Sequence, residues 1–336
     1  MSEGDDICQI CLAKGYVLAM TESPLQISLL DAALFDGWRE DLRNRWAHLR
    51  SESGKVTLQE ALAAVSRILD KRLSEGLSTA EQFVLGLFDG GRLIGSFWLE
   101  VKGDKGFLYD VVLNEKIDIE SLRSVIENEA LSRGALELRV NVFAGDQLLK
   151  SLTSSDAYRT VNSQMWLLDS PEEDHREVDS DLVLRAMTGD EFPDYRQWQI
   201  DNYAAEKVAA GRCSPEEALV ESIEEVAKLL PDGLDSEGQF IFVAELKNEK
   251  IGTIWMNINK ELEVPRAFGV YIEIEQSLRG QGLGRELMYA TRLECRKLGA
   301  KGFALSVFGH NSIARNLYES FGFEVTEVSK KRVFTS

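Results

Sequence analysis

The segment from Tyr271 to Gly299, YIEIEQSLRGQGLGRELMYATRLECRKLG, constrains the fold more than any other part of the chain. Its first residues alternate between polar and apolar side chains, a period of two that predicts a β-strand. A glycine-rich turn follows at 279–284, and apolar residues then recur at a helical spacing of about 3.6 residues up to Gly299. A strand, a glycine turn and a helix N-terminus direct backbone N–H groups at one point, a geometry that binds phosphate.

Three kinds of phosphate-binding turn compete for this segment. A P-loop requires G-x-x-x-x-G-K-[ST], a pattern that this sequence lacks. The G-x-G-x-x-G turn of dinucleotide-binding proteins could begin with Gly280 and Gly282, but Arg285 occupies the place of the third glycine. The pattern that fits is R-x-x-G-x-G, which runs from Arg279 through Gly282 to Gly284.

This turn resembles the coenzyme A pyrophosphate loop of the GNAT superfamily of N-acetyltransferases. A second motif, N-x-x-A-x-x-L-Y-x-x-x-G-F, begins at Asn311, includes Tyr318 and follows a short apolar strand at 303–307. It is similar to the fourth helix of that family, where the Asn lies beside the pantetheine arm and the Tyr lies near the thioester sulfur. The resemblance extends from about Leu182 to the C-terminus.

The resemblance implies acetyl-CoA as the cofactor and transfer of its acetyl group to a primary amine by direct attack in a ternary complex. Tyr318 is then the expected general acid for the departing thiolate, since a tyrosine with an ordinary pKa of about 10 stays protonated at neutral pH. Glu273 is the expected base, acting directly or through water, and Asp201, Glu206 and His310 are weaker alternatives. The cofactor is expected to contact Ile272, Ile274, Arg279, Gly280, Gln281, Gly282, Leu283, Gly284 and Asn311.

The N-terminal half of the sequence resembles a second copy of the C-terminal half. Ile94-Gly95-x-x-Trp98 matches Ile251-Gly252-x-x-Trp255 with an offset of 157 (251 − 94). Ala19-Met20-Thr21 also matches Ala186-Met187-Thr188, with an offset of 167 (187 − 20), and predicts a first strand there. Two helices are then expected, at about 26–49 and 58–74.

The N-terminal copy diverges at the residues that carry the predicted chemistry. Asp118-Ile119-Glu120-Ser121-Leu122 replaces the glycine turn, and acidic, non-glycine residues there would repel a pyrophosphate and block its approach. Thr153 stands where the other copy has Tyr318, and Asp146 stands where it has Asn311. This copy is therefore predicted to keep the fold and to lose the cofactor site.

These observations predict two tandem GNAT folds of the α/β (α+β) class, each with a mixed, mainly antiparallel central sheet flanked by helices. Residues 1–168 would form a degenerate GNAT-like domain, 169–179 an acidic linker, and 180–336 the catalytic domain. A module that binds or senses acyl-CoA without catalysis is the alternative.

Four cysteines and three histidines offer no metal site, and the lone pair Cys8-x-x-Cys11 is expected to be reduced thiols.

The formal net charge of −18 argues against a nucleic-acid partner and is compatible with a cationic amine, either a small molecule or a peptide. No apolar run approaches the ~20 residues of a membrane span, so no membrane association is expected. The N-terminus lacks the features of a secretory signal, which makes the cytoplasm the expected location. The sequence leaves open whether the chain forms a homodimer.

Overall fold

A computed structural model of the chain describes residues 25–52, 56–168, 181–259 and 265–334. The expected linker at 169–179, the Cys8–Cys11 pair and the strand expected at 19–21 lie outside these residues. No helix in the described ranges combines the length and the apolar character that crossing a membrane requires.

The two halves contain the same elements in the same order, which confirms the internal repeat. The first half consists of β1 (Gln26–Leu29), α2 (Ala32–Ser51), α3 (Leu58–Arg72), β2 (Gln82–Asp89), β3 (Arg92–Lys102), β4 (Lys105–Leu113), α4 (Ile119–Ser132), β5 (Glu137–Phe143), α5 (Gln147–Leu152) and β6 (Arg159–Leu168). The second consists of β7 (Leu182–Ala186), α6 (Phe192–Ala209), α7 (Pro215–Leu229), β8 (Gln239–Leu246), β9 (Glu249–Asn259), β10 (Arg266–Ile274), α8 (Leu283–Lys297), β11 (Gly302–Phe308), α9 (Ser312–Ser320) and β12 (Glu324–Val333).

The repeat extends to individual hydrogen bonds. Trp98 donates its indole N–H to Gln82 Oε1 at 2.8 Å, and Trp255 donates to Gln239 Oε1 at 2.8 Å, again with an offset of 157 (255 − 98). The N-termini of α3 and α7 carry the same capping box, in which a hydroxyl side chain and a glutamate three residues later satisfy each other's backbone N–H groups.

The match of Ala19-Met20-Thr21 with Ala186-Met187-Thr188 is wrong. Leu29 of β1 pairs with Leu85 as Ala186 of β7 pairs with Phe242, so the first strands follow the offset of 157 as well (186 − 29 and 242 − 85). The helix expected from residue 26 begins only at Ala32, because Asp31 caps it by accepting a hydrogen bond from the N–H of Ala33 at 2.8 Å. Four residues of β1 are too few to reveal a strand period.

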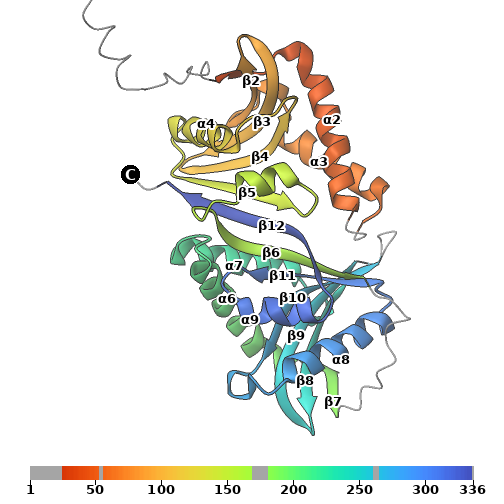
Figure 1. Cartoon of the computed structure of the whole chain (residues 1–336). Coiled ribbons are helices and arrows are strands. Elements are labelled where there is room, and N and C mark those ends of the chain that lie inside the picture. Colours follow the sequence, from red (N-terminus) through yellow and green to blue (C-terminus); the bar gives the residue numbers. More distant parts are fainter. Residues whose placement is uncertain (1–24, 53–55, 169–180, 260–264, 335–336) are drawn as a thin grey trace, which may run out of the picture.

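All strands of the described residues belong to one twelve-stranded sheet in the order β1-β2-β3-β4-β5-β12-β6-β11-β10-β9-β8-β7 (Figure 1). Among these described strands, only the pairs β4–β5 and β10–β11 are parallel, which confirms the predicted mixed, mainly antiparallel class. The last strand of each half lies in the other half: β6 pairs with β11, and β12 pairs with β5. The halves are therefore consecutive in sequence but share a single sheet.

Helices cover both faces of the sheet because consecutive strand residues point to opposite faces. In the first half, Trp98 packs with α2 and α3, whereas its neighbours Phe97 and Leu99 pack with α4 and α5. In the second half, Trp255 packs with α6 and α7, and Ile254 lies in the core that includes residues of α8 and α9.

The turn between α6 and α7 crosses the seam between the halves. Arg139 of β5 donates a hydrogen bond to the carbonyl of Arg212 at 2.9 Å, and Lys331 of β12 donates to the carbonyl of Gly211. An ion pair of 3.5 Å also joins Lys105 of β4 to Glu217 of α7. The α6–α7 side of the second half thus lies against the sheet of the first half.

Candidate active site

The two parallel strands of the second half separate and open a gap in the sheet. β10 and β11 pair only from Ala267 opposite Phe303 to Gly269 opposite Leu305, whereas β10 continues alongside β9 as far as Ile274. Glu275 donates its N–H to the carbonyl of Ile251 on β9 at 2.9 Å. Because antiparallel bonding alternates, the backbone groups of Ile272 and Ile274 face the opening instead.

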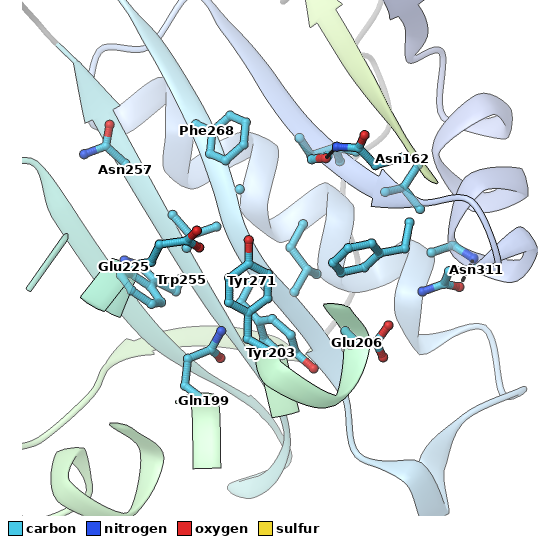
Figure 2. A pocket seen from close by; sticks show the side chains of 18 of the residues that line it. Asn162, Gln199, Tyr203, Glu206, Glu225, Trp255, Asn257, Phe268, Tyr271 and Asn311 are labelled. Carbon is cyan, nitrogen blue, oxygen red and sulfur yellow. Dashed lines mark hydrogen bonds between the residues drawn. The ribbon is translucent and has the colours of Figure 1, made fainter. Parts of the chain in front are cut away.

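A cavity of about 350 Å³ lies in this opening (Figure 2). Three of the predicted site residues line it: Ile272, Asn311 and Tyr318. Helices α6 and α7 supply the opposite wall, and Asn162 comes from β6, the strand that the first half contributes. The exchange of strands therefore brings Asn162 to a cavity whose other lining residues come from the second half.

Tyr318 lies in α9 and is 8% exposed. Its hydroxyl has no hydrogen-bond partner among the described residues, and burial raises its pKa to about 12. Asn311 begins the same helix, where its Oδ1 accepts a hydrogen bond from the N–H of Ala314 at 3.1 Å. Asn311 thus holds the start of the helix that carries Tyr318 into the cavity.

The glycine turn ends at a helix N-terminus that no side chain of the described residues caps. Gly280 and Gly282 have φ angles of +79° and +82°, and a Cβ at either would meet no atom of the described residues within 4 Å. A Cβ at Gly284 would lie 3.2 Å from Cδ2 of Leu317 in α9, so this glycine permits close packing. Gln281 is exposed, and Leu283 is the first residue of α8. An uncapped N-terminus behind an open turn suits an anionic group.

The corresponding helix of the first half, α4, has a filled N-terminus. The carboxylate of Asp118 accepts a hydrogen bond from the N–H of Ser121 at 2.8 Å. Thr153, the counterpart of Tyr318, is buried and donates its hydroxyl to the carbonyl of Leu149 at 2.7 Å. A carboxylate already holds the position that a phosphate would take.

Arg279 folds back onto β10. Its Nη2 lies 2.9 Å from Oε1 of Glu273, and its Nε donates to the carbonyl of Ile274 at 3.0 Å. Burial raises the pKa of Glu273, and the neighbouring Arg279 opposes that shift. The carbonyl of Ile274 is therefore engaged, whereas its N–H faces the opening.

Glu273 and Tyr318 line different hollows. Glu273 lies in a second hollow together with Tyr195 and Trp198, while the neighbouring Tyr271 lines the cavity of Tyr318. The rings of Trp198, which lines the hollow, and Tyr271, which lines the cavity, pack edge to face with 5.2 Å between their centroids. The geometry does not bring the expected acid and the expected base together.

Another carboxylate lies in the cavity of Tyr318. Glu206 lines its wall, and Oε2 of Glu206 lies 3.0 Å from Nε2 of His310. Both residues were weaker alternatives in sequence, and nothing in the sequence indicated that they meet. Asp201, the third alternative, is exposed and accepts a hydrogen bond from Gln197 at 3.1 Å.

Sequence reasoning named Glu206 but missed two other polar residues of α6, which are Gln199 in the cavity wall and Asn202. Gln199 is 2% exposed, and its Oε1 has no hydrogen-bond partner among the described residues. Asn202 donates a hydrogen bond to the hydroxyl of Tyr271 at 2.7 Å. The available signal was the spacing of Gln199, Tyr203 and Glu206 at i, i+4 and i+7, which puts three polar tips on one helix face (Figure 2).

The first half holds a buried ion pair where the second half has Tyr271 and Asn202. Asp110 is fully buried, pairs with Arg45 and accepts a hydrogen bond from the indole N–H of Trp46 at 3.1 Å.

Within the described ranges, no group of three or more Cys, His, Asp or Glu side chains is arranged to hold a metal ion.

Comparison with known proteins finds similarity to acetyltransferases. The profile of the Acetyltransferase (GNAT) family matches residues 192–323. The uncharacterized N-acetyltransferase YycN of Bacillus subtilis (strain 168) is 34% identical over 154 residues, which cover 45% of this chain and 98% of that protein. The uncharacterized N-acetyltransferase YdgE of the same organism is 27% identical over 152 residues, 45% of this chain and 97% of that protein.

Among solved structures, a GCN5-related N-acetyltransferase from Sphaerobacter thermophilus is similar along nearly the whole chain. The alignment covers 94% of this chain and 97% of that protein, with 14% identity and a TM-score of 0.47.

Proposed function

Because this chain belongs to the GNAT family of acetyltransferases, we propose that it transfers an acetyl group from acetyl-CoA to a primary amine. The observation that carries the proposal is the opening between β10 and β11, where the hydroxyl of Tyr318 has no hydrogen-bond partner among the described residues. The acceptor is a small molecule or a peptide with a free amine.

The turn and the opened strand fit the two parts of coenzyme A. N–H groups of residues 280–284 would hold the pyrophosphate, with helix-dipole support worth ~1 kcal/mol for each favourable contact. The exposed backbone edge at Ile272 and the N–H of Ile274 would hydrogen-bond the pantetheine arm. When bound, acetyl-CoA supplies the activated acetyl group. The uncapped start of α8 and the open space around Gly280 and Gly282 support this assignment.

In the proposed reaction, Tyr318 donates its proton to the departing sulfur. Its pKa of about 12 keeps it protonated at neutral pH, as this role requires. A second group must take a proton from the incoming ammonium before the amine attacks. Glu273 remains a candidate that would act through water, but the position of Glu206 in the wall of the Tyr318 cavity favours the Glu206–His310 pair.

The acceptor amine would bind between α6 and the opening. Leaving a buried amide oxygen without a donor costs ~1–3 kcal/mol, and Oε1 of Gln199 has no donor among the described residues, so it suits a ligand that donates a hydrogen bond. We propose that residues 180–336 supply the catalytic groups, and that residues 1–168 shape the site without binding coenzyme A. The carboxylate of Asp118 at the start of α4 supports this division.

Calorimetric titration with acetyl-CoA tests the cofactor part of the proposal. One site per chain is expected in the parent protein and none in Gly282→Glu, whose side chain is anionic and unsuited to the left-handed backbone. A panel of amines, assayed by release of free thiol, tests the chemistry. Binding without thiol release from any amine would instead favour an acyl-CoA sensor, for which the same opening would suffice.

A further inference from the structure

The Tyr318 cavity extends beyond the groups that the proposed reaction uses. Its lining includes Trp255 and Asn257 of β9 and Phe268 of β10. Figure 2 shows Trp255 and Asn257 toward one side of the view and Glu206 toward the other. The cavity therefore has room for a part of the acceptor that lies away from the amine.

In the first half, a tyrosine ring fills the equivalent space. Tyr109 of β4 packs against Trp98 with 4.5 Å between the ring centroids, and its hydroxyl donates a hydrogen bond to Glu100. The guanidinium of Arg72 lies 4.5 Å from the centroid of the same ring. The ring is thus held by an indole, a guanidinium and a carboxylate.

Strand pairing identifies the counterparts of these residues in the second half. The register between β3 and β4 skips Tyr109, and the register between β9 and β10 skips Val270. Val270 is therefore the counterpart of Tyr109. The other counterparts follow the offset of 157 and are Trp255 for Trp98, Asn257 for Glu100 and Leu229 for Arg72 (255 − 98, 257 − 100 and 229 − 72).

The second half keeps the surroundings of this ring but lacks the ring itself. Trp255 has the same indole hydrogen bond as its counterpart, yet it makes no ring contact with another aromatic side chain of the described residues. Val270 and Leu229 line the cavity in place of a tyrosine and an arginine. Asn257 donates its Nδ2 to the carbonyl of Gly238 at 3.3 Å, and its Oδ1 accepts no hydrogen bond from a described residue.

The charges in the lining indicate where the amine lies. Glu206 and Glu225 are the carboxylates that line the cavity. Glu225 is already paired with the buried Lys207 at 3.1 Å, whereas Glu206 contacts His310. An ammonium group is therefore expected beside Glu206, and the side with Trp255 is left for an uncharged group.

We propose that the acceptor is an amine with a hydroxylated aromatic ring, and that this ring lies between Trp255 and Leu229. The ring hydroxyl donates to Oδ1 of Asn257, as the hydroxyl of Tyr109 does to the counterpart of Asn257, while the amine lies beside Glu206. This inference rests on the proposed acetyl transfer, because it assigns the remote part of the same acceptor. A free aromatic amine and a peptide that begins with tyrosine share this chemistry.

The first test compares amines that differ only at the remote end. (4-Hydroxyphenyl)alkylamines, phenylalkylamines and straight-chain alkylamines are assayed together with peptides that begin with tyrosine. We expect kcat/KM to be about tenfold higher for phenylalkylamines than for alkylamines, because the ring contacts an indole. The hydroxyl should add a further factor of about three to ten, the usual effect of one hydrogen bond. A preference for the peptides or for the free amines identifies the source of the ring.

Val270→Tyr introduces the ring that the first half has at this position. It should abolish the preference for aromatic over straight-chain amines and leave the affinity for acetyl-CoA unchanged. Val183→Tyr is the matched control, because Val183 is an exposed strand residue outside the cavity and the preference should survive there. Aromatic amines that are still preferred by a folded Val270→Tyr protein would overturn the inference.

Asn257→Leu tests the hydroxyl contact separately, and it keeps the inference testable if Val270→Tyr fails to fold. The variant should lose the advantage of hydroxyphenyl over phenyl compounds, while the preference for phenylalkylamines over alkylamines stays. The phenyl series is therefore the internal control. Equal use of all three series by the parent protein, or a hydroxyl advantage that persists in Asn257→Leu, would contradict the assignment.

Calorimetry with the same amines in the presence of coenzyme A, which carries no acetyl group, separates the two proposals. Tighter binding of the hydroxyphenyl amines that is lost in Val270→Tyr would support the aromatic subsite even if no amine were acetylated. Acetylation together with equal binding of all three series would support the transferase and remove the subsite.

Discussion

The Nε2 atom of His310 lies 3.0 Å from Oε2 of Glu206, although the two residues are 104 positions apart in the chain. Glu206 lines the cavity that contains Tyr318, whereas Glu273 lines a separate hollow. This pairing puts a carboxylate–imidazole group on the α6 side of the cavity.

Glu206→Gln should therefore lower kcat by ~100-fold, the lower end of the usual contribution of a general base. Glu273→Gln should lower kcat less than about tenfold, and the two variants are compared by their pH–rate profiles with saturating acetyl-CoA. The reverse order of the two losses would assign the base to Glu273.

Removing the hydroxyl of Tyr318 should impair chemistry without affecting folding. Tyr318→Phe breaks no hydrogen bond with a described residue, so its melting temperature should stay close to that of the parent protein, while kcat falls ~100-fold. Tyr195→Phe is the matched control, since the hydroxyl of Tyr195 is also buried without a hydrogen-bond partner among the described residues but lies outside the Tyr318 cavity. A Tyr318→Phe enzyme with full kcat would refute the general-acid role.

The alkaline limb of the pH–rate profile gives a second test of Tyr318. Burial raises its pKa to about 12, so the proton that it donates should be retained well above the ordinary tyrosine pKa of about 10. Activity that requires protonated Tyr318 should therefore persist at about pH 10. A loss of kcat at that pH in the parent protein, with a flat profile in Tyr318→Phe, would show a lower pKa than this environment implies.

The glycine turn should be sensitive to substitution for two separable reasons. Gly282→Ala and Gly299→Ala each force a side chain into a left-handed backbone, at φ of +82° and +88°, and each should cost ~1 kcal/mol of unfolding free energy. Only Gly282→Ala should also weaken acetyl-CoA binding, because Gly299 lies at the far end of α8. Equal affinity in the two variants would place the pyrophosphate elsewhere.

The first half should lose stability, but no acetyl-CoA site, when α4 loses its cap. Asp118→Ala should cost ~1 kcal/mol of unfolding free energy, the usual value of an N-cap side chain. Calorimetry should still detect one acetyl-CoA site per chain, with its affinity unchanged. A second site in the parent protein that disappears in Asp118→Ala would show that the first half binds the cofactor.

The ion pair inside the first half makes a prediction with a defined pH dependence. Arg45→Ala leaves the buried carboxylate of Asp110 without its counter-charge and should cost ~3–5 kcal/mol near neutral pH. Burial already raises the pKa of Asp110, and Arg45 opposes that shift. The folded state of the variant therefore binds a proton at a higher pH than the unfolded state does.

Its stability should consequently rise as the pH falls from neutrality through the raised pKa of folded Asp110 towards the unfolded value near 4. Denaturant unfolding at several pH values measures this slope. Arg45→Ala combined with Asp110→Asn provides the control, because it removes the ionisable group. A slope that persists in the double variant would have to arise from another residue.

The sequence alone determined the local parts of this protein. The left-handed turn at Gly280 and Gly282, the capping boxes of α3 and α7, and the repeat around Trp98 and Trp255 all depend on neighbours within a few residues or on a fixed offset. Hydrogen bonds to nearby backbone and the periods of strand and helix are properties of short segments, so they are visible without a fold.

Only the tertiary structure decided which distant segments meet. The exchange of β6 and β12 depends on which open strand edges become neighbours, and that is a property of the assembled sheet. The packing of elements within the second half separates Glu273 from Tyr318 and brings Glu206 to His310. These contacts join residues far apart in sequence, so their formation depends on the packing of whole elements and leaves no short-range pattern along the chain.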